Sequence, residues 1–186
     1  MTVAIAAYAG ICLAMVSVEL ALARRGSADA APAAKFSDQI MVLGTTAALI
    51  IGLISAALRM GAVAPRGVAL VVGVVLGLAG VALRGFAMST LGRYYSLTPQ
   101  AETDQAIVTR GPYRLIRHPG YAGILLSILG LQLIAGTWVA LFSMLFVLVP
   151  LPVRIRIEEQ LLLEQVGTRY EDYEHRTRYR LLPGIY

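Results

Sequence analysis

Four long apolar stretches, nearly free of charged residues, limit what this chain can fold into. They run from Val3 to Ala23, from Gln39 to Leu58, from Val68 to Met88 and from Pro119 to Val153. An α-helix needs about 20 apolar residues to cross the hydrocarbon core of a bilayer, which is about 30 Å thick. The chain has 58% hydrophobic and 15% charged residues, whereas about 25% of a soluble domain is charged. These features exclude a soluble globule and predict an integral membrane protein.

The first three stretches each predict one membrane span. The first is expected to be a retained helix, because no basic segment precedes it and it is longer than a signal-peptide core. The fourth has 35 uncharged residues, too many for one crossing and slightly few for two. Gly136 and Thr137 divide it near its middle, where glycine can end one helix and threonine can cap the next. The expected fold is therefore all-α: a polytopic membrane helix bundle of about five transmembrane helices, the last two forming a helical hairpin, with a cytoplasmic C-terminal helix.

Lys and Arg residues are distributed unequally between the two sides of this bundle. With the N-terminus outside, the cytoplasmic segments carry 13 of them and the opposite side carries only Arg59 and Arg66. Cytoplasmic loops of membrane proteins have such an excess of positive charge. We therefore expect the N-terminus outside and the C-terminus in the cytoplasm. The net charge of +5 is attributed to topology and to contact with anionic membrane lipids, with no nucleic-acid partner.

Two polar clusters flank the predicted hairpin, which should bring them together on the cytoplasmic side. The first is GPYRLIRHPGYAG, from Gly111 to Gly123, a loop shaped by glycine and proline that enters a span at Pro119. Arg117 and His118 immediately precede this proline. In the alternative interpretation the cluster only anchors the protein at the interface, with tyrosines among the headgroups and arginines on lipid phosphates.

The second polar cluster begins at Arg154, where Pro150 and Pro152 bend the chain away from the last span. In a helix Arg154 and Glu158 share one face because they are four residues apart, while Glu159 points elsewhere. The pair could contact each other or a zwitterionic ligand. The alternative is a surface salt bridge on an interfacial amphipathic helix, worth about a few tenths of a kcal/mol.

Other features carry less functional information. Two histidines and one cysteine without ligand spacing predict no metal site. The GxxxG pattern of Gly73 and Gly77, continued by Gly80, is expected to pack against helices of the same chain, in a monomer, rather than to form a dimer. Glu19 and Arg84, charges within spans, are expected to pair with each other or to snorkel to the cytoplasmic interface.

Five motifs occur in order in the second half of the chain. They are GPY at Gly111–Tyr113, RHPGYAG at Arg117–Gly123, RxxxEE at Arg154–Glu159, GxxYxxY at Gly167–Tyr173 and RLLPGIY at Arg180–Tyr186. Together they resemble the isoprenylcysteine carboxyl methyltransferase family and its wider phospholipid methyltransferase relatives. The resemblance covers roughly Leu91 to Tyr186, and the first two spans carry none of the motifs.

The resemblance implies an integral-membrane methyltransferase that uses S-adenosyl-L-methionine and acts on a lipophilic acceptor arriving from the bilayer, without a Rossmann domain. It implies one domain, 1–186, with two N-terminal spans in 1–67 and a catalytic core with a cytoplasmic cofactor site in 68–186. The implied cofactor-binding residues are Gln100, Gln105, Ile107, Val108, Tyr113, His118, Pro119, Gly120, Tyr121 and Glu158. Arg154 would bind the acceptor, and Arg154 and Glu158 would be the catalytic residues. Gln105 stands where the family has a histidine.

Two alternative functions have different chemistry. Some membrane reductases that bind a nicotinamide cofactor have a similar C-terminal core, and an accessory membrane protein could keep the fold without turnover. The acceptor could be a carboxylate, a thiol or an amine. The Ala-, Arg- and Val-rich composition with little lysine favours a bacterial protein of the inner membrane.

Overall fold

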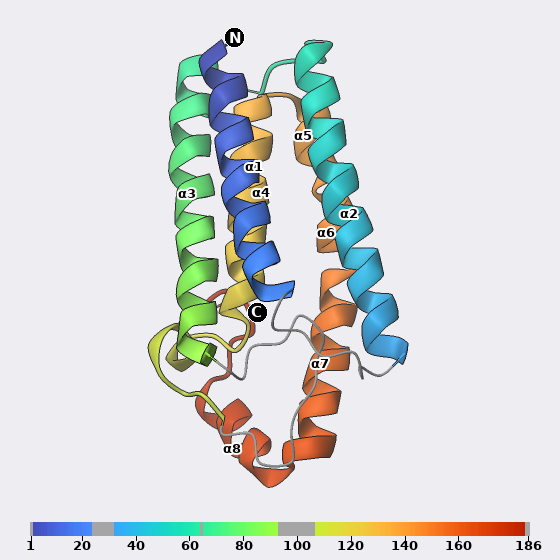
Figure 1. Ribbon diagram of the computed structural model, residues 1–186, viewed down its shortest axis with the longest axis vertical. Coiled ribbons are helices and arrows are strands. Elements are labelled where there is room, and N and C mark those ends of the chain that lie inside the picture. The colour runs from blue at the N-terminus through green and yellow to red at the C-terminus, as the bar shows by residue number, and fades with distance from the viewer. Residues whose placement is uncertain (1, 24–31, 64, 93–106, 185–186) are drawn as a thin grey trace.

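The chain folds into a bundle of long and short helices (Figure 1). The computed structural model describes residues 2–23, 32–63, 65–92 and 107–184. The helices are α1 (Thr2–Ala23), α2 (Pro32–Ala57), α3 (Arg66–Leu91), η2 (Gly111–Arg114), α4 (Pro119–Ala135), α5 (Trp138–Ser143), α6 (Leu145–Leu148), α7 (Leu151–Val166) and α8 (Thr168–Arg176). The prediction of an all-α fold is confirmed.

Three helical segments in the described residues are long and apolar enough to cross a membrane: Lys35–Ala57, Arg66–Leu91 and Trp138–Val166. Val3–Val18 and Pro119–Ala135 are shorter apolar helices. The chain is therefore an integral membrane protein, as predicted, and the number of five spans stays a prediction.

The predicted hairpin is present, and its turn is where the sequence places it. Gly136 ends α4 in the left-handed region, with a φ of 71° that favours glycine. The Thr137 side chain accepts a hydrogen bond of 3.1 Å from the Ala140 N–H and so caps α5. The Ser55 hydroxyl lies 2.7 Å from the Thr137 hydroxyl, and Val63 N–H donates to Gly136 O at 3.1 Å. The turn after α2 and the hairpin turn therefore lie together at one end of the bundle.

The opposite end gathers the polar segments. Figure 1 shows η2, the start of α4, the end of α7 and α8 at this end, together with the first turns of α2. The hairpin thus returns the chain to the end from which α4 starts, as predicted from the two flanking clusters. Side chains from α4 and α7 can therefore contribute to one site.

Glycines allow α3 and α4 to approach closely. A β-carbon on Gly73 would lie 2.6 Å from the Gly130 carbonyl oxygen, and one on Gly80 would lie 2.6 Å from the Gly123 carbonyl oxygen. A β-carbon on Gly77 would instead lie 2.7 Å from the Ile11 side chain of α1. At Gly73 and Gly80 a side chain would force the backbones of α3 and α4 apart, so these two positions need glycine. The prediction that this pattern packs within the chain is confirmed.

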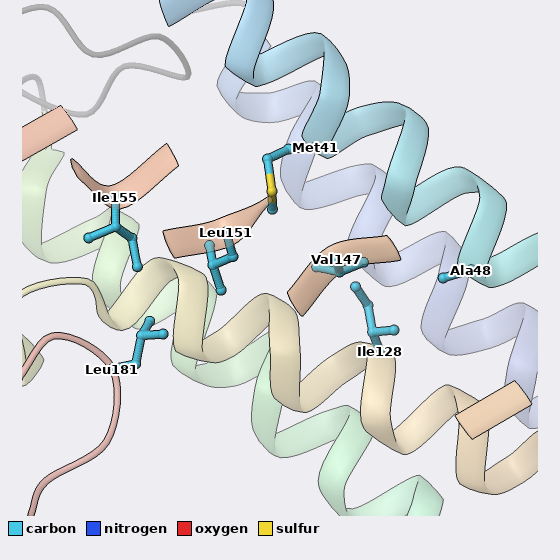
Figure 2. Close-up of a cluster of buried hydrophobic side chains, with 7 residues drawn as sticks. All are labelled: Met41, Ala48, Ile128, Val147, Leu151, Ile155 and Leu181. Atoms are coloured by element: carbon cyan, nitrogen blue, oxygen red, sulfur yellow. The ribbon is translucent and has the colours of Figure 1, made fainter. Parts of the chain in front are cut away.

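A cluster of buried apolar side chains fixes α7 against α2 and α4, as Figure 2 shows. Its members are Met41 and Ala48 of α2, Ile128 of α4, Val147 of α6, Leu151 and Ile155 of α7, and Leu181 of the C-terminal segment. Leu151 and Ile155 flank Arg154 along α7. Their burial therefore fixes the rotation of α7 about its axis and the direction of its polar residues.

Candidate active site

The start of α4 is held by the C-terminal segment of the chain. Pro119 occupies the first helical position, where its missing N–H costs no helical hydrogen bond. The two preceding residues donate backbone hydrogen bonds across to this segment, Arg117 N–H to Tyr179 O and His118 N–H to Arg180 O, both 2.9 Å. These contacts bury His118 and bring the Arg180 side chain to the site.

His118 lies between the carboxylates of two consecutive glutamates. Its Nε2 is 3.2 Å from Glu159 Oε1, and its Nδ1 is 3.8 Å from Glu158 Oε1. Glu159 is buried and is further contacted by Arg117 Nε at 3.0 Å and by the Arg180 guanidinium at 2.6 and 2.9 Å. A buried carboxylate with this many donors is fully paired. The Glu159 carboxylate thus links α7 to the start of α4 and to the C-terminal segment.

Arg154, Tyr121 and Glu158 form a chain of hydrogen bonds. The Arg154 Nε donates to the Tyr121 hydroxyl oxygen at 2.9 Å, and this hydroxyl donates to Glu158 Oε2 at 2.7 Å. The shared face predicted for Arg154 and Glu158 is therefore present. Arg154 is only 2% exposed, so the pair is not a salt bridge on the protein surface.

Two residues of α2 also contact Arg154. Its Nη1 donates to Ser37 Oγ at 2.8 Å, and its Nη2 forms an ion pair of 2.7 Å with Asp38 Oδ1. Sequence reasoning missed both residues, because the second span was drawn from Gln39 whereas α2 begins at Pro32. The only signal was a serine and an aspartate directly before an apolar stretch. Both lie outside residues 68–186.

The remaining predicted site residues lie at the start of α4 or before it. Tyr113 in η2 is buried, and its carbonyl oxygen accepts a hydrogen bond of 2.8 Å from the Tyr173 hydroxyl. The Gly120 carbonyl oxygen accepts from Arg84 Nη1 at 3.2 Å. Arg84 is buried, and this contact turns it toward α4.

The segment before η2 is less closely connected to this cluster. Ile107 and Val108 are half-buried, and within the described residues neither makes a hydrogen bond to His118 or Glu158. Gln100 and Gln105 lie outside the described residues. The structure thus brings together His118, Tyr121, Arg154 and Glu158 of the predicted set.

Helix α8 places two buried tyrosines beside the site. Burial raises the pKa of the Tyr170 hydroxyl, and the neighbouring Glu159 and Glu158 carboxylates raise it further. Burial also raises the pKa of the Tyr173 hydroxyl, against a smaller opposing effect of Arg117. Both hydroxyls are therefore protonated at neutral pH. The Tyr170 hydroxyl is buried and has no hydrogen-bond partner among the described residues.

Comparison with solved structures supports the fold. The structure of the eukaryotic intramembrane Ras methyltransferase ICMT aligns with 77% of this chain at a TM-score of 0.60 and 24% sequence identity. The alignment covers 52% of that longer chain. At this sequence identity the comparison shows only that the two proteins have a similar arrangement of helices.

Sequence comparisons give the family. A probable protein-S-isoprenylcysteine O-methyltransferase of Oryza sativa subsp. indica is 33% identical over 105 residues, 55% of each chain. The protein-S-isoprenylcysteine O-methyltransferase of Saccharomyces cerevisiae is 33% identical over 109 residues, 57% of this chain and 46% of the yeast protein. The uncharacterized protein YpbQ of Bacillus subtilis is 38% identical over 96 residues, 48% of this chain and 56% of YpbQ.

Each of these matches spans about half the length of the relative. The sequence model of the isoprenylcysteine carboxyl methyltransferase (ICMT) family matches residues 71–164, which include most of α3 and the cluster of His118, Tyr121, Arg154 and Glu158. This match covers slightly more than half of the chain, and so the chain belongs to the isoprenylcysteine carboxyl methyltransferase family.

Proposed function

We propose that this protein is an S-adenosyl-L-methionine-dependent methyltransferase that methylates a carboxylate on a lipophilic acceptor. The observation that carries the proposal is the chain of hydrogen bonds from the buried Arg154 through Tyr121 to the partly exposed Glu158, at the polar end of an apolar bundle. Relatives named as protein-S-isoprenylcysteine O-methyltransferases support the same reaction class. An acceptor of this kind has a long apolar tail and a terminal carboxylate.

The residues of the site fit S-adenosyl-L-methionine, which carries a sulfonium, an ammonium, a carboxylate and an adenine. The Glu158 side chain is 27% exposed, and its carboxylate can contact the sulfonium or the ammonium of the cofactor. His118 and Tyr121 supply polar tips and ring faces. The buried Tyr170 hydroxyl has an unused donor in the described structure. We therefore assign cofactor binding to the start of α4 together with Glu158, and retain Tyr113, Pro119, Gly120, Ile107, Val108, Gln100 and Gln105 as proposed contacts.

Arg154 is assigned to the acceptor. When bound, the cofactor supplies an electrophilic methyl group that a carboxylate oxygen can displace from sulfur, without a covalent enzyme intermediate. A carboxylate is already ionised at neutral pH and needs no base. Arg154 need only orient it, a task that suits the planar guanidinium. Burial of Arg154 keeps water from competing for these contacts.

An apolar groove supports a lipophilic acceptor. It has a volume of about 570 Å³ and lies between α2 and the segment of α6 and the two residues after it, with Ile40, Leu43, Phe146 and Val149 among its lining residues. Pro150, one helical turn before Arg154, also lines it. Gly44, which also lines the groove, lets α2 approach the backbone of α6 closely, because any side chain at this position would collide with the Phe146 carbonyl. An apolar tail in the groove would leave its polar end near Arg154.

We further propose that the protein is a monomer in a bacterial inner membrane, with its N-terminus outside and its C-terminus and site on the cytoplasmic side. The excess of Lys and Arg at the polar end supports this orientation. The use of the α3 glycines for contacts inside the chain supports a monomer.

A transfer assay tests the function. Purified protein in lipid nanodiscs is incubated with methyl-labelled S-adenosyl-L-methionine and, separately, with a prenylated cysteine, a long-chain fatty acid, a long-chain thiol and a long-chain amine. We expect label in a product that releases methanol on mild alkaline treatment, which is diagnostic of a methyl ester. Label in alkali-stable products would overturn the carboxylate assignment. Native membrane extract is tested as a further source of acceptors. If the protein binds S-adenosyl-L-methionine but transfers no methyl group to any acceptor, an accessory protein is favoured. If it binds a nicotinamide cofactor and not S-adenosyl-L-methionine, a reductase is favoured.

A further inference from the structure

We propose that Asp38 of α2 is a positioning residue, which with Ser37 holds Arg154 away from Glu158 and so keeps Glu158 available to the cofactor. The inference rests on the proposed function, since it assigns the cofactor to Glu158. Ser37 and Asp38 precede residues 71–164, the part that matches the family. Helix α2 would thus contribute to the site through Arg154.

The spacing of Arg154 and Glu158 makes the observed arrangement unexpected. Residues of opposite charge four apart on a helix lie close enough to pair directly, although Arg before Glu is the weaker order. In the described structure Arg154 makes no ion pair with Glu158, and the Tyr121 hydroxyl stands between them. The guanidinium is instead paired with a carboxylate from another helix. Something in the fold therefore competes successfully with the local partner.

Three nitrogens of Arg154 have three different partners. Nε reaches Tyr121 of α4, Nη1 reaches Ser37 and Nη2 reaches Asp38, at distances between 2.7 and 2.9 Å. Contacts at three points fix both the position and the plane of a guanidinium. Figure 1 shows the first turns of α2 beside α7, which is the approach that these contacts require.

Charge explains why Asp38 controls the side chain. Arg154 is buried, and a buried cation is strongly disfavoured unless an anion accompanies it. Asp38, with 31% of its side chain exposed, meets this need from the rim of the site and leaves Glu158 directed toward Tyr121 and His118. Glu158 is the acidic residue that shares a face of α7 with Arg154, and without Asp38 of α2 it would attract the guanidinium more strongly. Arg154 would then pair with Glu158 and compete with a cationic ligand.

The test measures the Kd of S-adenosyl-L-methionine by calorimetry for the full chain in nanodiscs. In Asp38→Ala the Kd should rise about tenfold or more, as expected for the loss of one ionic contact between cofactor and protein. The Gln39→Ala variant, altered at the exposed next residue of α2, should bind as the unaltered protein does. Asp38→Asn keeps an acceptor oxygen but no charge, so it should give a Kd between those of the unaltered protein and Asp38→Ala. It replaces Asp38→Ala in the test if Asp38→Ala does not fold.

A double-mutant cycle separates positioning from general support of the fold. In an Arg154→Ala background no guanidinium is left to pair with Glu158, so adding Asp38→Ala should change the Kd less than twofold, within about the error of additivity. An equal loss in both backgrounds, or no loss from Asp38→Ala alone, would overturn the inference. If the unaltered protein and Gln39→Ala both fail to bind the cofactor, the proposed function itself is wrong.

Discussion

The carboxylate of Glu159 lies 3.2 Å from Nε2 of His118, on the opposite side of the imidazole from Glu158. Consecutive residues of a helix point about 100° apart, so Glu158 and Glu159 diverge as they leave α7. Glu158 accepts a hydrogen bond from Tyr121 of α4, and Glu159 contacts His118, the residue directly before α4. The two glutamates share His118 but differ in their other partners, since Glu159 also contacts Arg117 and Arg180. They should therefore have separable roles.

Glu158→Gln should abolish cofactor binding while leaving the fold intact, because Glu158 is partly exposed and its amide can still accept from Tyr121. Glu159→Gln should instead mainly lower the melting temperature. It removes a buried charge shared by Arg117 and Arg180, and such a loss typically costs about 3 to 5 kcal/mol. Calorimetry with the cofactor and thermal unfolding of both variants would measure the difference. Equal effects of the two variants on cofactor affinity would contradict this division.

The sequence predicted those parts of the structure that depend on local patterns. The hairpin turn follows from the chemistry of Gly136 and Thr137, and the shared face of Arg154 and Glu158 follows from helical periodicity. The packing role of the α3 glycines could also be predicted, because small residues in a span allow helices to approach.

Contacts between distant segments could not be predicted in this way. The pairing of Glu159 with Arg180 depends on the path of the C-terminal segment past α4, which no helical period encodes. Asp38 could not be predicted for another reason. Hydropathy places a span boundary at charged residues, so the predicted span begins at Gln39 and leaves out Asp38, whereas α2 begins at Pro32.

Gly123→Ala should destabilise the protein, because a β-carbon there would lie 2.8 Å from the Gly80 carbonyl oxygen and from the Arg84 backbone nitrogen. Overpacking of this kind costs about 1 to 3 kcal/mol, and backbone atoms cannot move aside as a side chain can. Gly85→Ala is the matched control, since no atom lies within 4 Å of its β-carbon. Thermal unfolding in one detergent should show a lower melting temperature for Gly123→Ala alone. A similar loss at Gly85 would mean that helix contact is not the cause.

Tyr173→Phe should cost about 1 kcal/mol, the usual worth of one hydrogen bond, because its hydroxyl donates to the Tyr113 carbonyl. Burial raises the pKa of Tyr173, so its proton is held more tightly in the folded state than in the unfolded one. The difference in stability between wild type and Tyr173→Phe should thus be constant up to about pH 10, the unfolded pKa, and shrink above it. Unfolding measured from pH 7 to pH 11 would test this. A difference that already shrinks between pH 7 and pH 9 would contradict it.

The proposed membrane orientation can be tested with reporter fusions. An alkaline phosphatase inserted after Ala62, in the turn that follows α2, should be active because it lies outside. A green fluorescent protein fused after Tyr186 should fluoresce, since the segments that the sequence assigns to this side carry 13 positive charges, which favour the cytoplasm. Fluorescence from the Ala62 position, or phosphatase activity from the C-terminal one, would reverse the orientation and place the site on the other side.

Arg154→Ala and His118→Ala should affect different steps. Arg154 follows Pro150, a lining residue of the apolar groove, by one helical turn and is assigned to the acceptor. His118 lies in the cluster at the start of α4 that is assigned to the cofactor. Loss of a charged contact made mainly in the transition state costs about 2 to 4 kcal/mol, or about 30-fold to nearly 1,000-fold in rate. Arg154→Ala should therefore slow methyl transfer by this factor and leave the cofactor Kd within a few fold.

His118→Ala should raise the cofactor Kd itself, because the imidazole supplies a polar contact and also stands between Glu158 and Glu159. Steady-state rates at saturating cofactor, together with calorimetric titration, separate the two effects. Arg114→Ala is the control for a lost arginine, since Arg114 is exposed in η2, and it should change neither quantity. If Arg154→Ala lost cofactor affinity and kept normal turnover at saturation, the roles of Arg154 and His118 would have to be exchanged.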